Sequence, residues 1–312
     1  MLRTKEDIAK RLKIKNYEEI LQFPKYFEFE TINACNAKCL MCTVDSWDGS
    51  VSKVVSDDLW NKFVENVKPH KEWIEKITLT RHGEPLLDIK IATRIKVLKE
   101  IGIKKVVIVT NAQALSKRKA QEILEAGIDE IYFSVDGYSK EVYEKIRVGL
   151  NYNRVLENIL HFINLRDSNF HNTKIRLRMI EQDENKCEGE EWLSFWKSKL
   201  RFCGGGGDMA YIMPLHSWGN QLNIEAIDKV EYMSSFACIS PFSSMAIHYD
   251  GKVGICGVDY GSKYLLGDFS KSSIEYIWQE GFEKVRELHL SARRNDIWLC
   301  RGCDLWDRNY KY

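Results

Sequence analysis

Three cysteines within eight residues carry the most specific chemistry in this chain. Cys35, Cys39 and Cys42 have the spacing C-x3-C-x2-C and follow the alternating run 26–32, which is typical of a strand. Thiolates so spaced can hold three irons of a four-iron, four-sulfur cube and leave the fourth iron open to another ligand. The alternatives are a zinc knuckle or buried cysteines without metal. Zinc requires four ligands and the next histidine is His70, so the pattern favours the cube.

Four more cysteines lie near the end of the chain: Cys238, Cys256, Cys300 and Cys303. The last two form a C-x2-C clip. The stretch 245–256 is predicted to be a hairpin with Asp250-Gly251 as its turn, and residues 274–289 to be helical. Four thiols can complete either a zinc site or a second iron–sulfur cube, and their number alone does not separate the two metals.

The three-cysteine spacing after a strand resembles the signature of the radical S-adenosylmethionine (SAM) superfamily. The resemblance implies that the open iron binds the amino and carboxylate groups of SAM. Reduction by one electron then yields a 5′-deoxyadenosyl radical, which takes a hydrogen atom from the substrate. The four-cysteine segment is similar to the twitch or short SPASM extension of that superfamily. This similarity implies an auxiliary four-iron, four-sulfur cluster rather than zinc, so the protein is expected to hold two clusters. The resemblance covers about residues 26–312.

Several segments resemble the superfamily's SAM-binding motifs. Gly83-Glu84-Pro85 resembles the Gly-Gly-Glu-Pro motif, with His82 in place of the first glycine. The resemblance implies that the backbone at Gly83 approaches SAM closely and that Glu84 pairs with its ammonium group. The alternative is a strand-to-helix turn with Glu84 as a first-turn charge.

The next two strand ends supply further candidates. Ser134 and Asp136 match the Ser-x-Asp-Gly segment that faces the ribose of SAM, and Asn111 ends the preceding strand. The segment around Arg147 resembles one whose arginine contacts the SAM carboxylate, a group that arginine binds well. Helix capping or turn formation is the alternative for Asn111 and Asp136, and a solvated helix end for Arg147.

Strand-like and helix-like stretches alternate from residue 26. Strands are expected at 26–33, 74–80, 104–110, 130–136, 174–180 and 208–214, and helices near 56–68, 89–101, 116–126, 139–165 and 190–201. This order predicts right-handed βαβ crossovers and a parallel sheet. Six units are too few for a closed eight-stranded barrel. The expected fold is therefore α/β, a partial (β/α)6 TIM-like barrel with a small C-terminal β-hairpin plus helix domain, and its chemistry lies at the carboxyl ends of the strands.

Three domains are expected: an N-terminal helical extension at 1–24, the radical SAM partial barrel at 25–218 and the auxiliary cluster domain at 219–312. A formal net charge of +1 gives no reason to expect attraction to nucleic acid or to a membrane. No apolar run approaches the ~20 residues of a membrane span, and the N-terminus has no apolar signal core. Nine cysteines, an odd number, point to metal or catalysis in a reducing compartment, so we expect a cytoplasmic protein.

Other residues concern the substrate. Arg176 and Arg178 share one face of the fifth strand, where they either bind an anionic or hydroxyl-rich substrate or pair with surface carboxylates. His216 and Trp218 are possible pocket residues, with a capping and a core role as the alternative.

Two cysteines, Cys187 and Cys203, are not assigned to either cluster. Cys187 follows the fifth strand at the active end and is the better candidate for a hydrogen-atom donor, although a free cysteine is more often inert. Cys203 precedes the sixth strand, at the opposite end.

The single-auxiliary-cluster form is similar to aminocyclitol dehydrogenases, and related sugar and cyclitol enzymes are epimerases. The resemblance implies a radical SAM oxidoreductase or epimerase acting at a carbinol C–H of a sugar or cyclitol, with oxidation slightly favoured and with a flavodoxin- or ferredoxin-type electron donor. The alternative is modification of a peptide or protein, as in sulfatase maturation or in thioether formation or epimerisation of ribosomal peptides. A non-catalytic iron–sulfur electron carrier is a third possibility.

Overall fold

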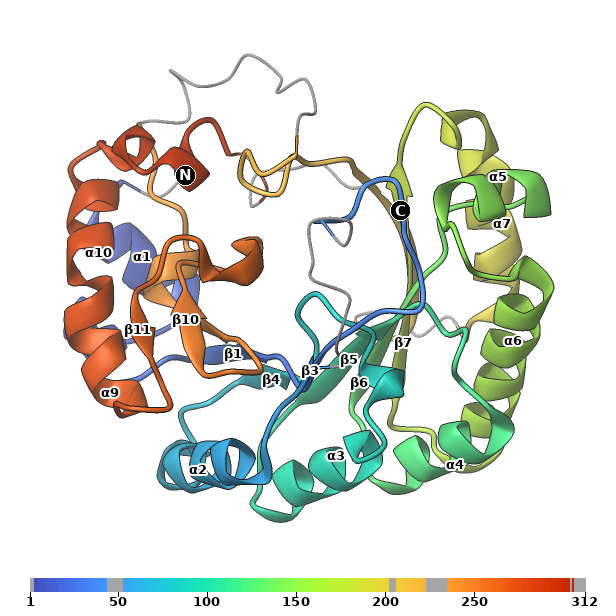
Figure 1. The fold of residues 1–312 in the computed structure, drawn as a ribbon, viewed down its shortest axis with the longest axis horizontal. Helices are drawn as coiled ribbons and strands as arrows, with labels where there is room; N and C mark the ends of the chain where they lie inside the picture. The colour runs from blue at the N-terminus through green and yellow to red at the C-terminus, as the bar shows by residue number, and fades with distance from the viewer. Residues whose placement is uncertain (1–2, 44–52, 202–205, 223–234, 304, 306–312) are drawn as a thin grey trace. The chain divides into compact units, whose positions relative to one another are not determined.

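The computed structural model describes residues 3–43, 53–201, 206–222, 235–303 and 305 (Figure 1). The chain forms two compact units. The first unit comprises Met1–Glu30, Val55–Ile77 and His216–Arg308, and the second comprises Thr31–Val54, Thr78–Leu215 and Asn309–Tyr312. The domain boundaries expected from the sequence stay predictions. No helix among the described residues combines the length and apolarity needed to cross a membrane.

The first unit contains a short mixed sheet. Its strands are β1 (Tyr26–Phe29), β4 (Lys76–Thr78, the last residue of which belongs to the second unit), β9 (Ser244–Ile247), β10 (Lys252–Gly254) and β11 (Gly267–Asp268), in the order β11-β10-β9-β1-β4. The hairpin predicted at 245–256 is confirmed, because β9 and β10 pair antiparallel and Gly251 takes the positive φ of 92° that its turn requires. The parallel pairing of β9 with β1 joins segments more than 200 residues apart.

The helices of the first unit begin with α1 (Lys5–Leu12), which Thr4 and Asp7 close with a capping box. α2 (Asp57–Val67) packs Phe63 against Phe29 at a ring separation of 4.2 Å. The single helix predicted at 274–289 is instead α9 (Ile274–Tyr276), a π-helical turn and α10 (Phe282–Leu290). A Cβ at Gly281 would stand 2.3 Å from the Leu266 carbonyl oxygen. The π-helical turn therefore approaches the backbone at Leu266 so closely that only glycine fits at position 281.

The second unit is built on four parallel strands: β5 (Val106–Thr110), β6 (Glu130–Ser134), β7 (Lys174–Glu181) and β8 (Met209–Pro214). A separate antiparallel pair joins β2 (Ile32–Asn33) to β3 (Lys53–Val54). The strands alternate with α3 (Ile91–Glu100), α4 (Lys117–Glu125), α5 (Lys140–Ile146), α6 (Tyr152–Asn169) and α7 (Gly189–Lys199). Figure 1 shows α3, α4 and α6 along one face of these strands. The predicted fold class, a mostly parallel α/β protein with antiparallel strands near its C-terminus, is confirmed.

Two predicted elements are each divided in the structure. The expected strand 26–33 is interrupted between β1 and β2, and the expected helix 139–165 consists of α5 and α6. Gly149 has a φ of 91°, which a right-handed helix does not accommodate, and the Asn151 side chain then caps α6 by accepting from Arg154 N–H. Because the helix is interrupted, the backbone carbonyls of residues 146–149 can accept hydrogen bonds from another segment of the chain.

Candidate active site and auxiliary thiol site

The loop that carries Cys35, Cys39 and Cys42 is held from one side by the break between α5 and α6. Lys38 N–H donates to the Val148 carbonyl at 2.8 Å, and Leu40 N–H donates to the Ile146 carbonyl at 3.1 Å. A Cβ at Gly149 would stand 3.4 Å from the Asn36 carbonyl oxygen. The backbone of residues 146–149 therefore sets the path of the cysteine loop.

Gly83 and Glu84 hold the start of the same loop. A Cβ at Gly83 would lie 2.0 Å from the Ile32 carbonyl oxygen, and Glu84 N–H donates to the Ala34 carbonyl at 2.8 Å. No side chain other than hydrogen fits at this approach, which accounts physically for glycine at this position.

The Glu84 carboxylate is buried and bound on both oxygens. Oε1 accepts from Leu86 N–H at 3.0 Å and from the Thr110 hydroxyl at 2.6 Å, and Oε2 accepts from Asn111 N–H at 2.8 Å. Burial raises the pKa of Glu84, and this effect outweighs the hydrogen bonds, which lower it. Glu84 is the N-cap residue of the short turn Pro85–Leu87, and its predicted contact with SAM stays a prediction. Among the described residues three donors occupy its oxygens, which leaves one acceptor position on Oε2, because a carboxylate offers about four.

Asn111 connects the end of β5 to the cysteine loop. Its Nδ2 donates to Asn36 Oδ1 at 2.8 Å and lies 3.9 Å from Cys35 Sγ, and its Oδ1 accepts from Gln113 N–H at 3.0 Å. Asn36 was not singled out in the sequence, where an asparagine between two cysteines carries no distinctive signal.

Asp136 and Arg147 form a buried ion pair beside the loop. Asp136 Oδ2 accepts from Arg147 Nε at 2.5 Å and contacts Nη2, while Oδ1 accepts from Ile180 N–H at 2.7 Å. Arg147 Nη1 donates to Cys39 Sγ at 3.5 Å. Burial alone would lower the pKa of Arg147, but the charges of Asp136 and Cys39 outweigh it, so the guanidinium stays protonated. Counting only contacts with described residues, two of its five N–H groups remain for a ligand.

Other predicted residues lie apart from this cluster of contacts. Ser134 Oγ accepts from Arg178 Nη2 at 2.9 Å. Cys187 is exposed, in a turn before α7, and Cys203 lies outside the described residues. His216 and Trp218 belong to the first unit, where His216 Nδ1 accepts from Trp218 N–H at 3.1 Å.

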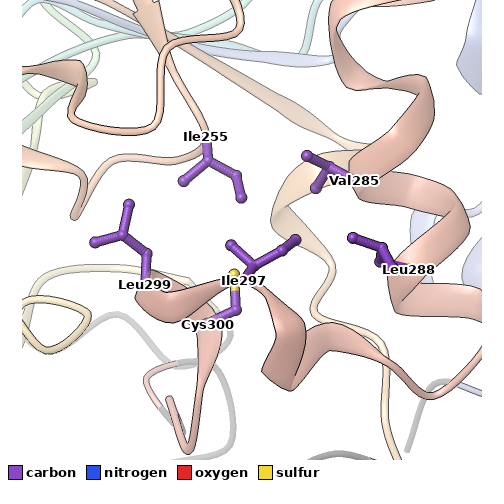
Figure 2. Close-up of a cluster of buried hydrophobic side chains, with 6 residues drawn as sticks. All are labelled: Ile255, Val285, Leu288, Ile297, Leu299 and Cys300. Carbon is purple, nitrogen blue, oxygen red and sulfur yellow. The ribbon is translucent and has the colours of Figure 1, made fainter.

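The four C-terminal cysteines all belong to the first unit, and Cys300 lies in its hydrophobic core. Figure 2 shows Cys300 among five aliphatic side chains: Ile255, Val285, Leu288, Ile297 and Leu299. Burial and then the charges of the other three thiols raise the pKa of Cys256, and burial raises that of Cys238 to about 11. The four thiols are therefore close enough to influence one another.

Two buried side chains that sequence reasoning missed hold the backbone of these cysteines. Arg294, 1% exposed, donates through Nη2 to the carbonyls of Cys300, at 3.0 Å, and Cys303. His289 Nδ1 accepts from Cys238 N–H at 3.0 Å. Burial lowers the pKa of His289 to about 3, so the imidazole is neutral. The sequence gives no sign of either role, since both residues lie in polar helical or turn segments.

Comparison with known proteins identifies the family. The model of the radical SAM superfamily matches residues 29–184, which is half of the chain. The chain belongs to the radical SAM superfamily. A second model, described as the SPASM iron-sulfur cluster-binding domain, matches residues 238–304.

Curated relatives of this radical SAM protein include a GTP 3′,8-cyclase of Limosilactobacillus fermentum, 31% identical over 171 residues, or 53% of this chain and 48% of that protein. The chain thus spans about half the length of the curated relatives it matches. Among solved structures, BtrN in complex with AdoMet and 2-DOIA has a TM-score of 0.63 at 17% identity, covering 90% of this chain and 92% of BtrN. SuiB of Streptococcus suis bound to precursor peptide SuiA has a TM-score of 0.65 at 13% identity, covering 88% and 68%. These structures share the fold of this chain.

Membership of the superfamily makes SAM and iron–sulfur clusters the cofactors of this radical SAM protein, with an auxiliary cluster in its SPASM domain. The donor chemistry fits: thiols are the ligands of such clusters, and within each of the two groups the charge of one thiol acts on another. Burial, followed by the charge of Glu84, raises the pKa of Cys35 to about 12, so cluster binding must displace protons. In the described part of the chain, no three Cys, His, Asp or Glu side chains are already gathered as a metal site. The assignment of individual cysteines as ligands remains a prediction.

Proposed function

We propose that this radical SAM enzyme takes a hydrogen atom from a carbinol C–H of a sugar or cyclitol and thereby oxidises or epimerises that carbon. The observation that carries the proposal is the likeness to BtrN with bound AdoMet and 2-DOIA over nine-tenths of both chains. The relatives named GTP 3′,8-cyclase give further support, because the 3′ carbon of GTP is a carbinol carbon of its ribose.

Cys35, Cys39 and Cys42 are the proposed ligands of the SAM-binding cluster. SAM bound there supplies the 5′-deoxyadenosyl radical. Asn111 and Arg147 position the cysteine loop through Asn36 and Cys39, and the free acceptor site on Glu84 suits the ammonium group of SAM. The two unused N–H groups of Arg147 suit its carboxylate.

Cys238, Cys256, Cys300 and Cys303 are the proposed ligands of the auxiliary cluster. With four thiols for four irons, that cluster has no position open for substrate, which favours electron transfer over substrate binding. Oxidation of the substrate radical requires loss of one electron, which a cluster held by these four cysteines would accept, and loss of the hydroxyl proton to a base. Epimerisation requires instead a hydrogen atom from a thiol, for which Cys187 is the candidate.

Peptide modification is the second candidate function. It is favoured by the likeness to SuiB bound to its precursor peptide, at a TM-score of 0.65. Either function needs a one-electron donor, and a flavodoxin or ferredoxin in the cytoplasm is the proposed partner.

The test uses the anaerobically reconstituted full chain with reductant and SAM. Cyclitols, sugars, sugar phosphates and nucleotides are compared with a panel of unstructured peptides, and 5′-deoxyadenosine and product mass are measured. Carbohydrate-dependent formation of 5′-deoxyadenosine, with a product that has lost two hydrogen atoms or is a stereoisomer, supports the proposal. Turnover with peptides alone favours the second candidate and rules out the first.

A further inference from the structure

The first unit contains a cavity of about 720 Å³ that is lined by none of the described cysteines. One wall comes from the N-terminal segment 5–22 and the other from the helical segment 279–291, and Figure 1 shows α1 beside α10 in this part of the unit. Cavities of roughly 300–1,000 Å³ suit a small ligand. The lining residues that carry charge or close the floor are Lys5, Tyr17, Glu280, Glu283, Arg286 and Glu287.

Contacts beneath the cavity fix its two walls to each other. Trp278, fully buried, donates from Nε1 to the Ile20 carbonyl at 2.6 Å, and the Arg286 guanidinium lies 4.2 Å from the centre of the same indole. The Tyr17 ring lies 6.1 Å from that of Phe242. The cavity is therefore already formed without a ligand, as small-molecule sites usually are.

Arg286 brings a buried and incompletely satisfied charge to the floor of the cavity. It is 3% exposed; Nε donates to the Pro241 carbonyl at 2.9 Å, whereas Nη2 has no hydrogen-bond partner among the described residues. Contact with Trp278 offsets part of the cost of burying the charge. Burial lowers the pKa of Arg286 to about 10, although the charges of Tyr17 and Glu283 raise it. A desolvated guanidinium with an unused donor favours a ligand that supplies an acceptor, best a carboxylate.

The helical wall also carries three carboxylates. Glu287 is paired with a lysine of its own helix, but Glu280 and Glu283 are exposed and have no ion-pair partner in the described part of the chain. Glu283 is three residues before Arg286, a spacing that separates the two Cβ atoms by about 5–6 Å on a helix. The cavity therefore presents a negative group one helical turn from the buried positive one, and Lys5 adds a positive charge from the other wall.

We propose that this cavity binds a free α-amino acid, with its carboxylate accepting from Arg286 and its ammonium group donating to Glu283. A simple anion would be repelled by the two unpaired glutamates, and a simple cation would leave the Arg286 guanidinium uncompensated. A zwitterion satisfies both ends of the site. Because the cavity shares no residue with either cysteine group, this binding does not depend on the function proposed above.

The experiment measures binding without turnover. The reconstituted full chain is screened with the standard L-amino acids at millimolar concentration by its thermal unfolding midpoint, and the affinity of those that raise the midpoint is measured by calorimetry. Two analogues of the amino acid that binds best are then compared with it: its amide, which lacks the carboxylate, and its deaminated acid, which lacks the ammonium group. Each should bind about tenfold more weakly or worse, the loss expected for a charged hydrogen bond.

Variants assign the two ends of the site. Glu283→Gln and Arg286→Gln should each weaken binding about tenfold or more, and Arg286→Lys, which keeps the charge, should recover part of the loss. Glu65→Gln, at an exposed glutamate of α2 outside the cavity, is the matched control and should bind like the wild type. Because Glu283 is exposed, its variant should fold even where the Arg286 variants do not. No response to any amino acid, an analogue that binds as well as its parent, or unchanged affinity in Glu283→Gln would overturn the proposal.

Discussion

Arg147 and Cys39 lie 108 positions apart in the chain, yet Arg147 Nη1 donates to Cys39 Sγ at 3.5 Å. Asp136, fully buried, fixes the guanidinium from the other side. A positive charge against a cluster thiolate stabilises the reduced, more negative cluster. The ion pair of Arg147 with Asp136, which follows β6, is therefore expected to raise the reduction potential of the candidate SAM cluster.

Arg147→Gln should make the SAM cluster harder to reduce. We expect the ratio of reduced to oxidised cluster at a fixed potential to fall about tenfold, which is 59 mV for one electron. Redox titration followed by electron paramagnetic resonance measures it. Lys145→Gln is the control, because that exposed side chain loses the same charge two residues away. Equal potentials in Arg147→Gln and the wild type would show that the contact has no electronic role.

Replacing Cys35, Cys39 and Cys42 together with Ala should abolish reductive SAM cleavage and leave about half of the iron, since the other four-thiol group is untouched. Iron analysis and chromatography of 5′-deoxyadenosine provide the measurement. Cys187→Ala, which removes an exposed thiol, should retain the full iron content. Cleavage by the triple variant would refute the ligand assignment.

Arg294→Gln should lose the auxiliary cluster selectively, because Arg294 holds the carbonyls of Cys300 and Cys303 in a buried site. We expect about half of the iron and a loss of about 3 kcal/mol in the free energy of unfolding of the metal-free chain, measured in urea. Arg293→Gln is the matched control: that neighbour is exposed and pairs with Asp296, so it should cost less than about 1 kcal/mol. Full iron retention by Arg294→Gln would contradict the prediction.

Cys187→Ala distinguishes oxidation from epimerisation. Oxidation requires no thiol, so the variant should form product at the wild-type rate and the product should contain no solvent deuterium. Epimerisation through Cys187 predicts deuterium at the inverted carbon in the wild type and loss of that product in the variant. Mass spectrometry of products formed in deuterated buffer decides between them.

Tyr132 should make the fold sensitive to alkaline pH. With a pKa near 12 in the folded chain and about 10 when unfolded, Tyr132 is protonated only in the native state between these values, so stability falls as pH rises from 10 to 12. Tyr132→Phe should reduce that loss by about 1–2 kcal/mol. Urea unfolding at several pH values tests this, with Tyr276→Phe, an exposed tyrosine, as the control that leaves the slope unchanged.

Local spacing in the sequence was enough to identify the cysteine loop and the family, because Cys35, Cys39 and Cys42 all lie within eight consecutive residues. The order of strand-like and helix-like stretches likewise predicted the parallel strands, since a crossover helix between two strands of one sheet makes them parallel. The sequence did not reveal the division of α5 from α6, which depends on the positive φ of Gly149 and on backbone bonds from Val148 to Lys38.

The partners of buried charges were decided only by the tertiary structure. Arg176 and Arg178 look equivalent in the sequence, yet Arg176 is paired because Glu130, 46 residues earlier, lies within its reach. Arg294 likewise reaches the cysteine backbone only after the chain has folded around it. Ion pairs and hydrogen bonds act over about 3–4 Å, and separation along the chain does not determine such distances between side chains on different strands and loops.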